Sequence, residues 1–258
     1  MRQSDEFYIG WQSKAALGIG KTVRKAVIAL ILIALLASAA LAISQRMIGA
    51  SVFEWGTQKN FSGILQTEPY PHLLVPRPGK VEGAPQFSTY YLVAPWKFGL
   101  NRAAIARLDG KMVSLKGTLI YRGGQTMVET KPEWIIASTS VQRRARSDAP
   151  YLNLGKQTLV GEIVDSKCFL GVMNPGQLAP HRACAIRCIS GGCPPVLLVR
   201  QKEGPPLYLL LVSVEGKPVN KQVLNVVAEP LEITGEVERQ GELLILRADP
   251  ATYQRVSQ

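Results

Sequence analysis

The chain repeats one pattern of short apolar runs and glycines at an interval of about 90 residues. Phe61-Ser62-Gly63 is matched by Leu159-Val160-Gly161, and the run Tyr90–Val93 is matched by Tyr208–Val212. Solenoid proteins repeat every 20 to 50 residues or so, and each repeat is a single supersecondary unit. The longer interval of this chain therefore predicts two tandem domains of the same kind.

Each half predicts a small β domain. In the first half, apolar runs between turn residues predict four strands, at 61–66, 90–94, 112–121 and 126–129. Gly123-Gly124 predicts a tight hairpin turn between the last two strands. Residues 101–108 predict a helix with Asn101 as its N-cap, and the proline- and glycine-rich residues 67–86 predict a long loop.

A five-stranded barrel with a helical segment before its fourth strand and a closing hairpin is typical of the OB fold. We therefore predict a mainly β protein, in which one N-terminal transmembrane helix is followed by two tandem small OB-like β-barrels. A plain β meander with glycine turns is the alternative. The expected parts are a cytoplasmic leader at 1–25, a transmembrane helix at 26–43, a first barrel at 47–140, a linker at 141–156 and a second barrel at 157–258.

The predicted transmembrane segment, 26–43, contains no charged residue. At about 1.5 Å per residue, its length just crosses the hydrocarbon core of a bilayer. Basic residues are concentrated before it, so the positive-inside rule places the N-terminus in the cytoplasm. Ala40-Leu41-Ala42 also suits signal-peptide cleavage, which is the alternative. The long leader, 1–25, contains two acidic side chains and favours an uncleaved anchor in the bacterial inner membrane, with both barrels in the periplasm.

The formal net charge of +11 is unevenly distributed. Residues 1–46 carry six basic and two acidic side chains, and 141–156 carry four and one, so seven of the eleven excess positive charges lie in the leader and the linker. Residues 157–258 carry ten of each sign. Because binding to a phosphate backbone requires clustered Lys and Arg, this distribution argues against a nucleic-acid partner.

All four cysteines lie in one stretch of the second half. The interval from Gly161 to Gly235 is longer than the corresponding interval of the first half, which runs from Gly63 to Gly117. The additional residues fall within the Cys/His loop, 165–195, which contains Cys168, His181, Cys184, Cys188 and Cys193. Glycines and prolines break this loop into turns, so its side chains are gathered locally.

The spacing of the Cys/His loop permits a metal site. In a helical turn, His181, Cys184 and Cys188 share one face, and Cys168 would complete a Cys3His set suited to zinc or copper(I). Structural disulfides, with Cys193 as a further member, are the interpretation that we favour over a metal site, because cysteines outside the cytoplasm usually form disulfides. A redox-active thiol pair is the third interpretation. His72, the only other histidine, lies among prolines and is expected to be exposed.

The motif D-S-x-C at 165–168, followed by H-x-x-C-x-x-x-C at 181–188, Gly191-Gly192 and an apolar strand, resembles a largely uncharacterised set of small exported bacterial OB-like proteins. The resemblance covers residues 159–247, about a third of the chain. Those proteins commonly have three cysteines, and Cys193 departs from their pattern. Asp165 is expected to hydrogen-bond backbone amides at the start of a turn.

These observations favour a non-catalytic role over an enzyme. We expect a membrane-anchored periplasmic accessory protein whose Cys/His loop holds a metal or a partner subunit. The complex that this protein serves is expected to be a membrane-bound redox complex. Its expected partners are the inner membrane and another membrane or periplasmic protein. A thiol-disulfide or metal-dependent redox protein is one alternative. An oligosaccharide- or nucleic-acid-binding OB module is another, with Tyr70, Tyr90, Tyr91 and Trp96 as stacking residues, although aromatics in strands are typical of a core.

Overall fold

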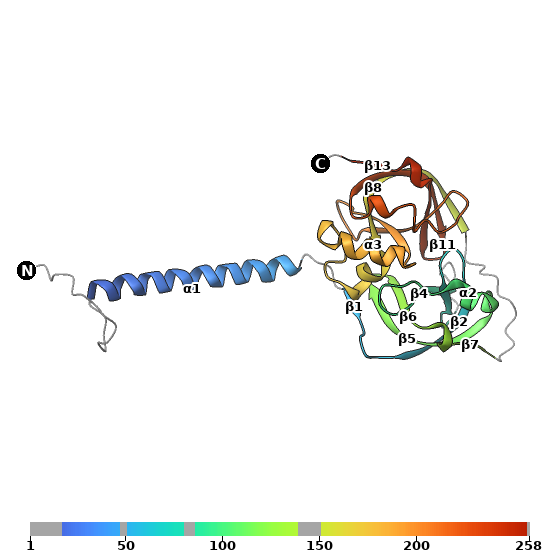
Figure 1. Ribbon diagram of the computed structural model, residues 1–258, viewed down its shortest axis with the longest axis horizontal. Coiled ribbons are helices and arrows are strands. Elements are labelled where there is room, and N and C mark those ends of the chain that lie inside the picture. The colour runs from blue at the N-terminus through green and yellow to red at the C-terminus, as the bar shows by residue number, and fades with distance from the viewer. Residues whose placement is uncertain (1–16, 47–50, 80–85, 139–150, 257–258) are drawn as a thin grey trace, which may run out of the picture. The chain divides into compact units, whose positions relative to one another are not determined.

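The computed structural model describes residues 17–46, 51–79, 86–138 and 151–256 (Figure 1). The chain divides into two units, Met1–Gly49 and Ala50–Gln258. The first unit contains α1, Leu17–Arg46, whose residues Gly18–Ser44 have a mean hydropathy of 2.9. The apolar side chains of α1 are exposed, and the helix is long and apolar enough to cross a membrane or to act as a signal sequence. It includes the predicted span, 26–43, and extends it in both directions.

The first barrel is closed by five strands in the order β5-β2-β3-β4-β6, with β6 pairing back to β5. The β4–β6 pair is parallel, and the other pairs are antiparallel. Two short strands, β1 and β7, pair with β5 outside the barrel. The strands are β1 Ser51–Phe53, β2 Lys59–Gln66, β3 His72–Pro76, β4 Phe87–Val93, β5 Met112–Arg122, β6 Gln125–Glu129 and β7 Ile135–Ala137.

The predicted helix of the first half is confirmed. It consists of α2, Arg102–Ile105, followed by the 3-10 turn η1, Ala106–Leu108, and the Asn101 side chain accepts a hydrogen bond from Ala104 N. The Gly123 hairpin turn is also confirmed, with a φ of 57°. A second 3-10 turn, η2 at Pro132–Trp134, precedes β7.

The second barrel repeats this topology. Its strands run in the order β12-β10-β9-β8-β11, β12 pairs back to β11, and β10–β12 is the parallel pair. The strands are β8 Tyr151–Asp165, β9 Pro195–Val199, β10 Leu207–Val212, β11 Pro230–Gln240, β12 Leu243–Arg247 and β13 Gln254–Arg255, with 3-10 turns η5 Leu224–Val226 and η6 Pro250–Thr252. Both halves of the prediction are therefore confirmed as closed five-stranded barrels of OB-like order.

Two details of the first half and the linker differ from the predictions. The expected loop at 67–86 contains β3, His72–Pro76, which pairs with β2 and β4 and carries three buried side chains. This strand was not predicted, because its proline-rich sequence context favours loops. The expected linker at 141–156 is shorter at its end, since β8 begins at Tyr151 and pairs there with Gln240 of β11. Residues 141–150 lie outside the described residues.

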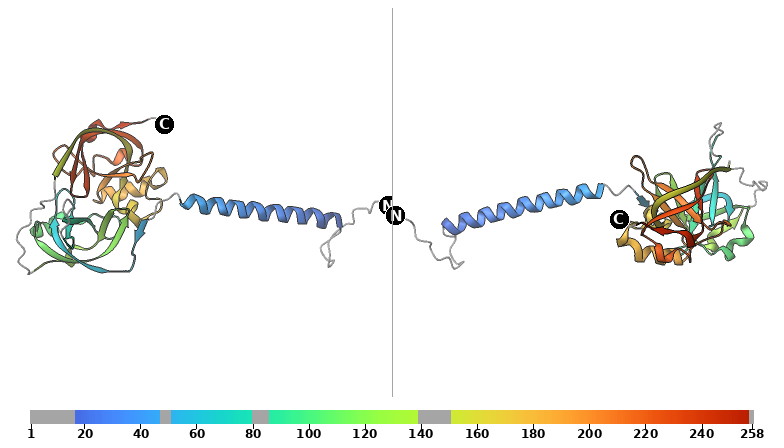
Figure 2. Two further views of the ribbon diagram at one scale, coloured as in Figure 1. Left: turned by 180° about the vertical axis from the view of Figure 1, so that it is seen from behind. Right: turned by 90° about the horizontal axis from the view of Figure 1, so that it is seen from above.

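The two barrels lie next to each other (Figure 2) and share one apolar core. This core joins Tyr91 and Met127 of the first barrel to Val164, Phe169 and Tyr208 of the second. Each barrel also has a core of its own. Burial of apolar area drives this association, so the two barrels form one compact unit.

Candidate metal centre

The Cys/His loop is inserted between the first and second strands of the second barrel. After β8 it forms a helical turn, η3, at Cys168–Val172, then a 3-10 turn, η4, at Ala179–His181, and then α3, Arg182–Ser190, before β9. Asp165 starts the turn as predicted, because its Oδ1 accepts a hydrogen bond of 2.7 Å from Cys168 N. The Glu162 carboxylate accepts a bond from Leu178 N and holds the middle of the loop.

The end of α3 is fixed by polar contacts. The Asn220 amide donates to Ile189 O and Cys193 O, both at 2.8 Å. Gly192, with a φ of 102°, turns the chain into the next strand at a backbone conformation that side chains rarely adopt. Cys184 and Cys188 therefore lie one turn apart on α3, and Cys193 lies buried just after the end of this helix.

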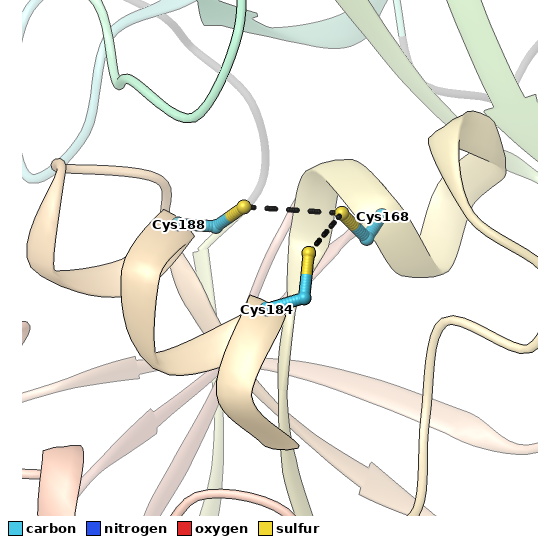
Figure 3. A group of neighbouring side chains, drawn as sticks. All are labelled: Cys168, Cys184 and Cys188. Atoms are coloured by element: carbon cyan, nitrogen blue, oxygen red, sulfur yellow. Dashed lines mark hydrogen bonds between the residues drawn. The ribbon is translucent and has the colours of Figure 1, made fainter. Parts of the chain in front are cut away.

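Three cysteines form a cluster (Figure 3). Cys168 Sγ lies 3.8 Å from both Cys184 Sγ and Cys188 Sγ, and all three sulfurs lie within 4.8 Å of one another. Cys168 comes from η3, whereas the other two come from α3. A tetrahedral ion with metal–sulfur bonds of about 2.3 Å sets its sulfur ligands about 3.8 Å apart. The sulfur triad therefore has the spacing of a set of ligands to one soft metal ion.

The structure does not contain the predicted structural disulfides. All four cysteines are free in the structure, and the sulfurs of Cys168 and Cys184 are 3.8 Å apart, whereas a bonded pair is separated by about 2.05 Å.

His181 belongs to a second group that shares Cys168 with the first. Its Nε2 lies 2.9 Å from Asp165 Oδ2, and the ligand atoms of Asp165, Cys168 and His181 lie within 4.8 Å of one another. His181 is 4% exposed and Asp165 is fully buried. Burial raises the pKa of Asp165, and the hydrogen bond from His181 opposes this shift. A carboxylate paired with a histidine is a common support for a metal ligand. His181 as a fourth ligand remains a prediction.

Hydrogen bonds within the cluster shift the pKa values of its thiols in opposite directions. The bonds donated by Cys168 and then Cys193 lower the pKa of Cys188. Donation of its proton to Cys188, together with burial, raises the pKa of Cys168, and the same causes raise the pKa of Cys193. Because a metal ligand must be a thiolate, Cys188 is the sulfur best prepared to bind a cation first.

A lysine of the first barrel completes the cluster. Lys97 Nζ donates to Cys184 Sγ at 2.7 Å, and this bond raises the pKa of Lys97. Cys184 is half-buried, while the other three cysteines are at most 2% exposed. Sequence spacing could not find Lys97, because it is far from Cys184 along the chain and reaches the cluster only through the packing of the barrels.

The segment that carries Lys97 is clamped to the second barrel. Lys167, 1% exposed, donates to Ala94 O and Trp96 O, each at 2.7 Å. Gly99 N donates to Gly191 O at 2.9 Å, and a Cβ on Gly99 would lie 2.1 Å from Gly192 O. Only a glycine permits this approach of two backbones. Lys167 occupies the variable position of the D-S-x-C motif, which gave no reason to assign it a role.

The remaining sequence candidates are placed elsewhere. His72 is 6% exposed, which corrects the expectation of an exposed side chain; its Nδ1 lies 2.8 Å from Tyr70 O and its ring packs on Tyr91. Tyr70 and Tyr91 are each 2% exposed, so they belong to the core, as aromatics in strands usually do. Of the four aromatics considered for stacking, Trp96 is the one that is largely exposed, at 80%.

Comparison with protein-family models finds no match, and comparison with curated proteins finds none either. Among solved structures, the chain is similar to a deletion mutant of the single-stranded DNA-binding protein from Thermus aquaticus, at 14% identity. The match covers 81% of this chain and 96% of that chain, with a TM-score of 0.20. A TM-score of 0.20 supports no conclusion about the fold or the ligand of this chain.

Proposed function

We propose that the protein is a membrane-anchored metal-binding protein, non-catalytic, whose Cys/His loop holds one zinc or copper(I) ion through Cys168, Cys184 and Cys188. The observation that carries this proposal is the pair of 3.8 Å sulfur–sulfur distances centred on Cys168. Thiolate ligands select soft or borderline ions over magnesium or calcium, which prefer oxygen. The carboxylate-supported His181 is the fourth ligand in this proposal.

The burial of the cluster supports a protein that retains its ion rather than one that exchanges it rapidly. Cys168 and Cys188 are buried, and the half-buried Cys184 marks the accessible side. An ion would enter and leave past Cys184 and Lys97. We propose that this side faces a partner protein in the bacterial periplasm, that α1 anchors the chain in the inner membrane with its N-terminus in the cytoplasm, and that the ion serves a membrane-bound redox complex. The apolar length of α1 supports an anchor.

The test is metal binding by the full chain in detergent, purified with thiols reduced. Zinc and copper(I) are titrated against a chromophoric chelator, and cobalt(II) is used as a spectroscopic probe of thiolate coordination. We expect one ion per chain, with intense thiolate-to-metal absorption in the cobalt form. Substituting any one of the three ligand cysteines with serine should weaken binding at least 100-fold. Loss of a residue that only supports a ligand through a hydrogen bond typically lowers metal affinity 10- to 100-fold, and loss of the ligand itself should lower it further.

Cys193→Ser is the matched control, because Cys193 is buried in the same loop but lies in neither ligand group. It should retain the one-ion stoichiometry. His181→Gln tests the fourth ligand and should change the cobalt spectrum. No ion bound by the reduced wild-type chain, or equal loss in Cys193→Ser and Cys184→Ser, would overturn the proposal.

A further inference from the structure

The four cysteines differ sharply in access. Cys184 is half-buried, whereas Cys168, Cys188 and Cys193 are 2%, 1% and 0% exposed. A disulfide from outside must align with the sulfur that attacks it, and exchange rates depend on this access. Cys184 is therefore the one thiol of the four that an external disulfide can reach without opening of the core.

A second thiol stands directly behind the accessible one. Cys168 Sγ is 3.8 Å from Cys184 Sγ and projects from a different element, as Figure 3 shows. A sulfur–sulfur bond of about 2.05 Å requires the two atoms to approach by less than about 2 Å. Because this gap is small, we expect the pair to form a bond through a local movement of the two side chains.

Lys97 adds a positive charge at the accessible sulfur. Its Nζ is 2.7 Å from Cys184 Sγ, and its side chain comes from the other barrel. The thiolate is the form that attacks disulfides, and the Lys97 ammonium group lies in contact with the sulfur that would carry this charge during the attack. Lys97 is therefore placed beside the one sulfur of the cluster that an external disulfide can reach.

We propose that the metal-free protein carries out thiol–disulfide exchange, with Cys184 as the attacking thiol and Cys168 as the resolving thiol. The Cys184 thiolate attacks a disulfide RSSR, forms a Cys184–S–S–R bond and releases RS⁻. Cys168 gives up its proton, with the Cys188 sulfur 3.8 Å away or water as the acceptor, and then attacks Cys184 Sγ, which releases the second RS⁻. Two protein thiols are oxidised to one disulfide, and RSSR is reduced to two thiols, which take their protons from water and Cys188.

This activity goes beyond the proposed metal binding and does not require it. It also has a consequence for the metal. The Cys168–Cys184 bond would remove two of the three thiolate ligands, so oxidation would prevent binding or release the ion. Metal occupancy would in turn protect the thiols, because bound thiolates are not available as nucleophiles.

The test uses the reduced, chelator-treated full chain in detergent and glutathione disulfide as the probe. We expect the wild type to consume one glutathione disulfide per chain, release two glutathiones and contain a Cys168–Cys184 bond in the peptide map. In Cys168→Ser, one glutathione should remain attached to Cys184, because no resolving thiol is present. Lys116→Met, an exposed lysine on β5 outside the cluster, should behave as the wild type.

Acid quenching of the wild-type reaction at early times gives a measurement independent of any variant, and the trapped glutathione should map to Cys184. A trapped adduct on another cysteine, a Cys184–Cys188 bond as the product, or no glutathione consumed by the wild type would overturn the inference. The metal titration is read separately. A chain that binds an ion but does not exchange refutes this inference alone, and a chain that exchanges but binds no ion refutes the proposed function alone.

Discussion

Lys167 Nζ of the second barrel lies 2.5 Å from Glu129 Oε2 of the first, and the lysine side chain is 1% exposed. The same ammonium group donates to Ala94 O and Trp96 O, so all three of its protons are used between the barrels. A buried lysine is tolerated only when it is paired and fully hydrogen-bonded. The ion pair therefore holds together the two barrels and the segment that brings Lys97 to Cys184.

Lys167→Met should destabilise the protein by about 3 kcal/mol, because it leaves the Glu129 carboxylate and two carbonyl groups without their partner. The measurement is the midpoint of urea unfolding. Lys59→Met is the matched control, since Lys59 pairs with Glu54 at 2.6 Å but its side chain is 46% exposed. That surface pair should contribute less than about 1 kcal/mol. Equal effects of the two substitutions would contradict the role given to the buried pair.

Lys97→Met should weaken metal binding about 10-fold, because the thiolate of Cys184 loses a partner that offsets the negative charge of the ligand set. Lys97 is exposed, so we expect little change in unfolding. The measurement is competition with a chelator. Lys116→Met, an exposed lysine on β5, provides the comparison. Tighter binding in Lys97→Met would show that repulsion of the incoming cation outweighs this support.

Gly99→Ala should destabilise the contact between the barrels by about 2 kcal/mol or more, as is usual for overpacking, since its Cβ would lie 2.1 Å from the backbone oxygen of Gly192. The shift should also draw Lys97 away from Cys184 and weaken metal binding. Gly124→Ala, where a Cβ meets nothing within 4 Å, should change stability by less than about 0.5 kcal/mol. Thermal unfolding compares the two, and an unaffected Gly99→Ala would refute the close approach.

Trp96→Gly should stabilise the fold by up to about 1 kcal/mol, because Trp96 has a φ of 62° and is 80% exposed. Glycine relieves the backbone strain at this position while little buried area is lost. Phe98→Gly lies two residues away at a position without a positive φ, and it should lower stability by about 0.5 to 1 kcal/mol. Urea unfolding measures both. A loss of stability in Trp96→Gly would indicate that the indole makes contacts that outweigh the strain.

Stability should fall as the pH drops below about 6.5. Burial lowers the pKa of His72 below its ordinary value of 6.5, although the Tyr70 carbonyl and the Asp109 charge oppose the shift. The unfolded chain then binds a proton at a higher pH than the folded chain does, so the contribution is present above pH 6.5 and is lost as the pH approaches the folded pKa. His72→Gln should reduce this slope. An unchanged slope between about pH 7 and pH 5 would contradict the assignment.

Most of the architecture could be predicted from the sequence, because strands, turns and caps depend largely on local patterns. Alternation and glycine turns located four of the five barrel strands of the first half, Asn101 marked the helix start, and the repeat indicated two similar barrels. The spacing of the Cys/His loop also predicted that Cys168, Cys184 and Cys188 lie together, whereas the fourth predicted ligand, His181, lies in a second group with Asp165 and Cys168. The roles of Lys97 and Lys167 could not be predicted from the sequence, since the partners of each lysine lie on the other barrel. The burial of His72 was missed for a similar reason: prolines hid β3, and only barrel closure encloses it.

The two barrels share one strand order but differ in the connection between their first and second strands. In the first barrel, β2 and β3 are joined by the short segment 67–71, in which Tyr70 accepts a hydrogen bond of 3.1 Å from Val219 N through its hydroxyl. In the second, β8 and β9 are joined by the much longer segment 166–194, which carries the ligands. The second barrel therefore carries the cysteine ligands, and the first barrel contributes Lys97 beside them. A chain built from two copies of the first barrel would lose all three cysteines, and one built from two copies of the second would keep the cysteines but lose Lys97, so the two halves are not interchangeable.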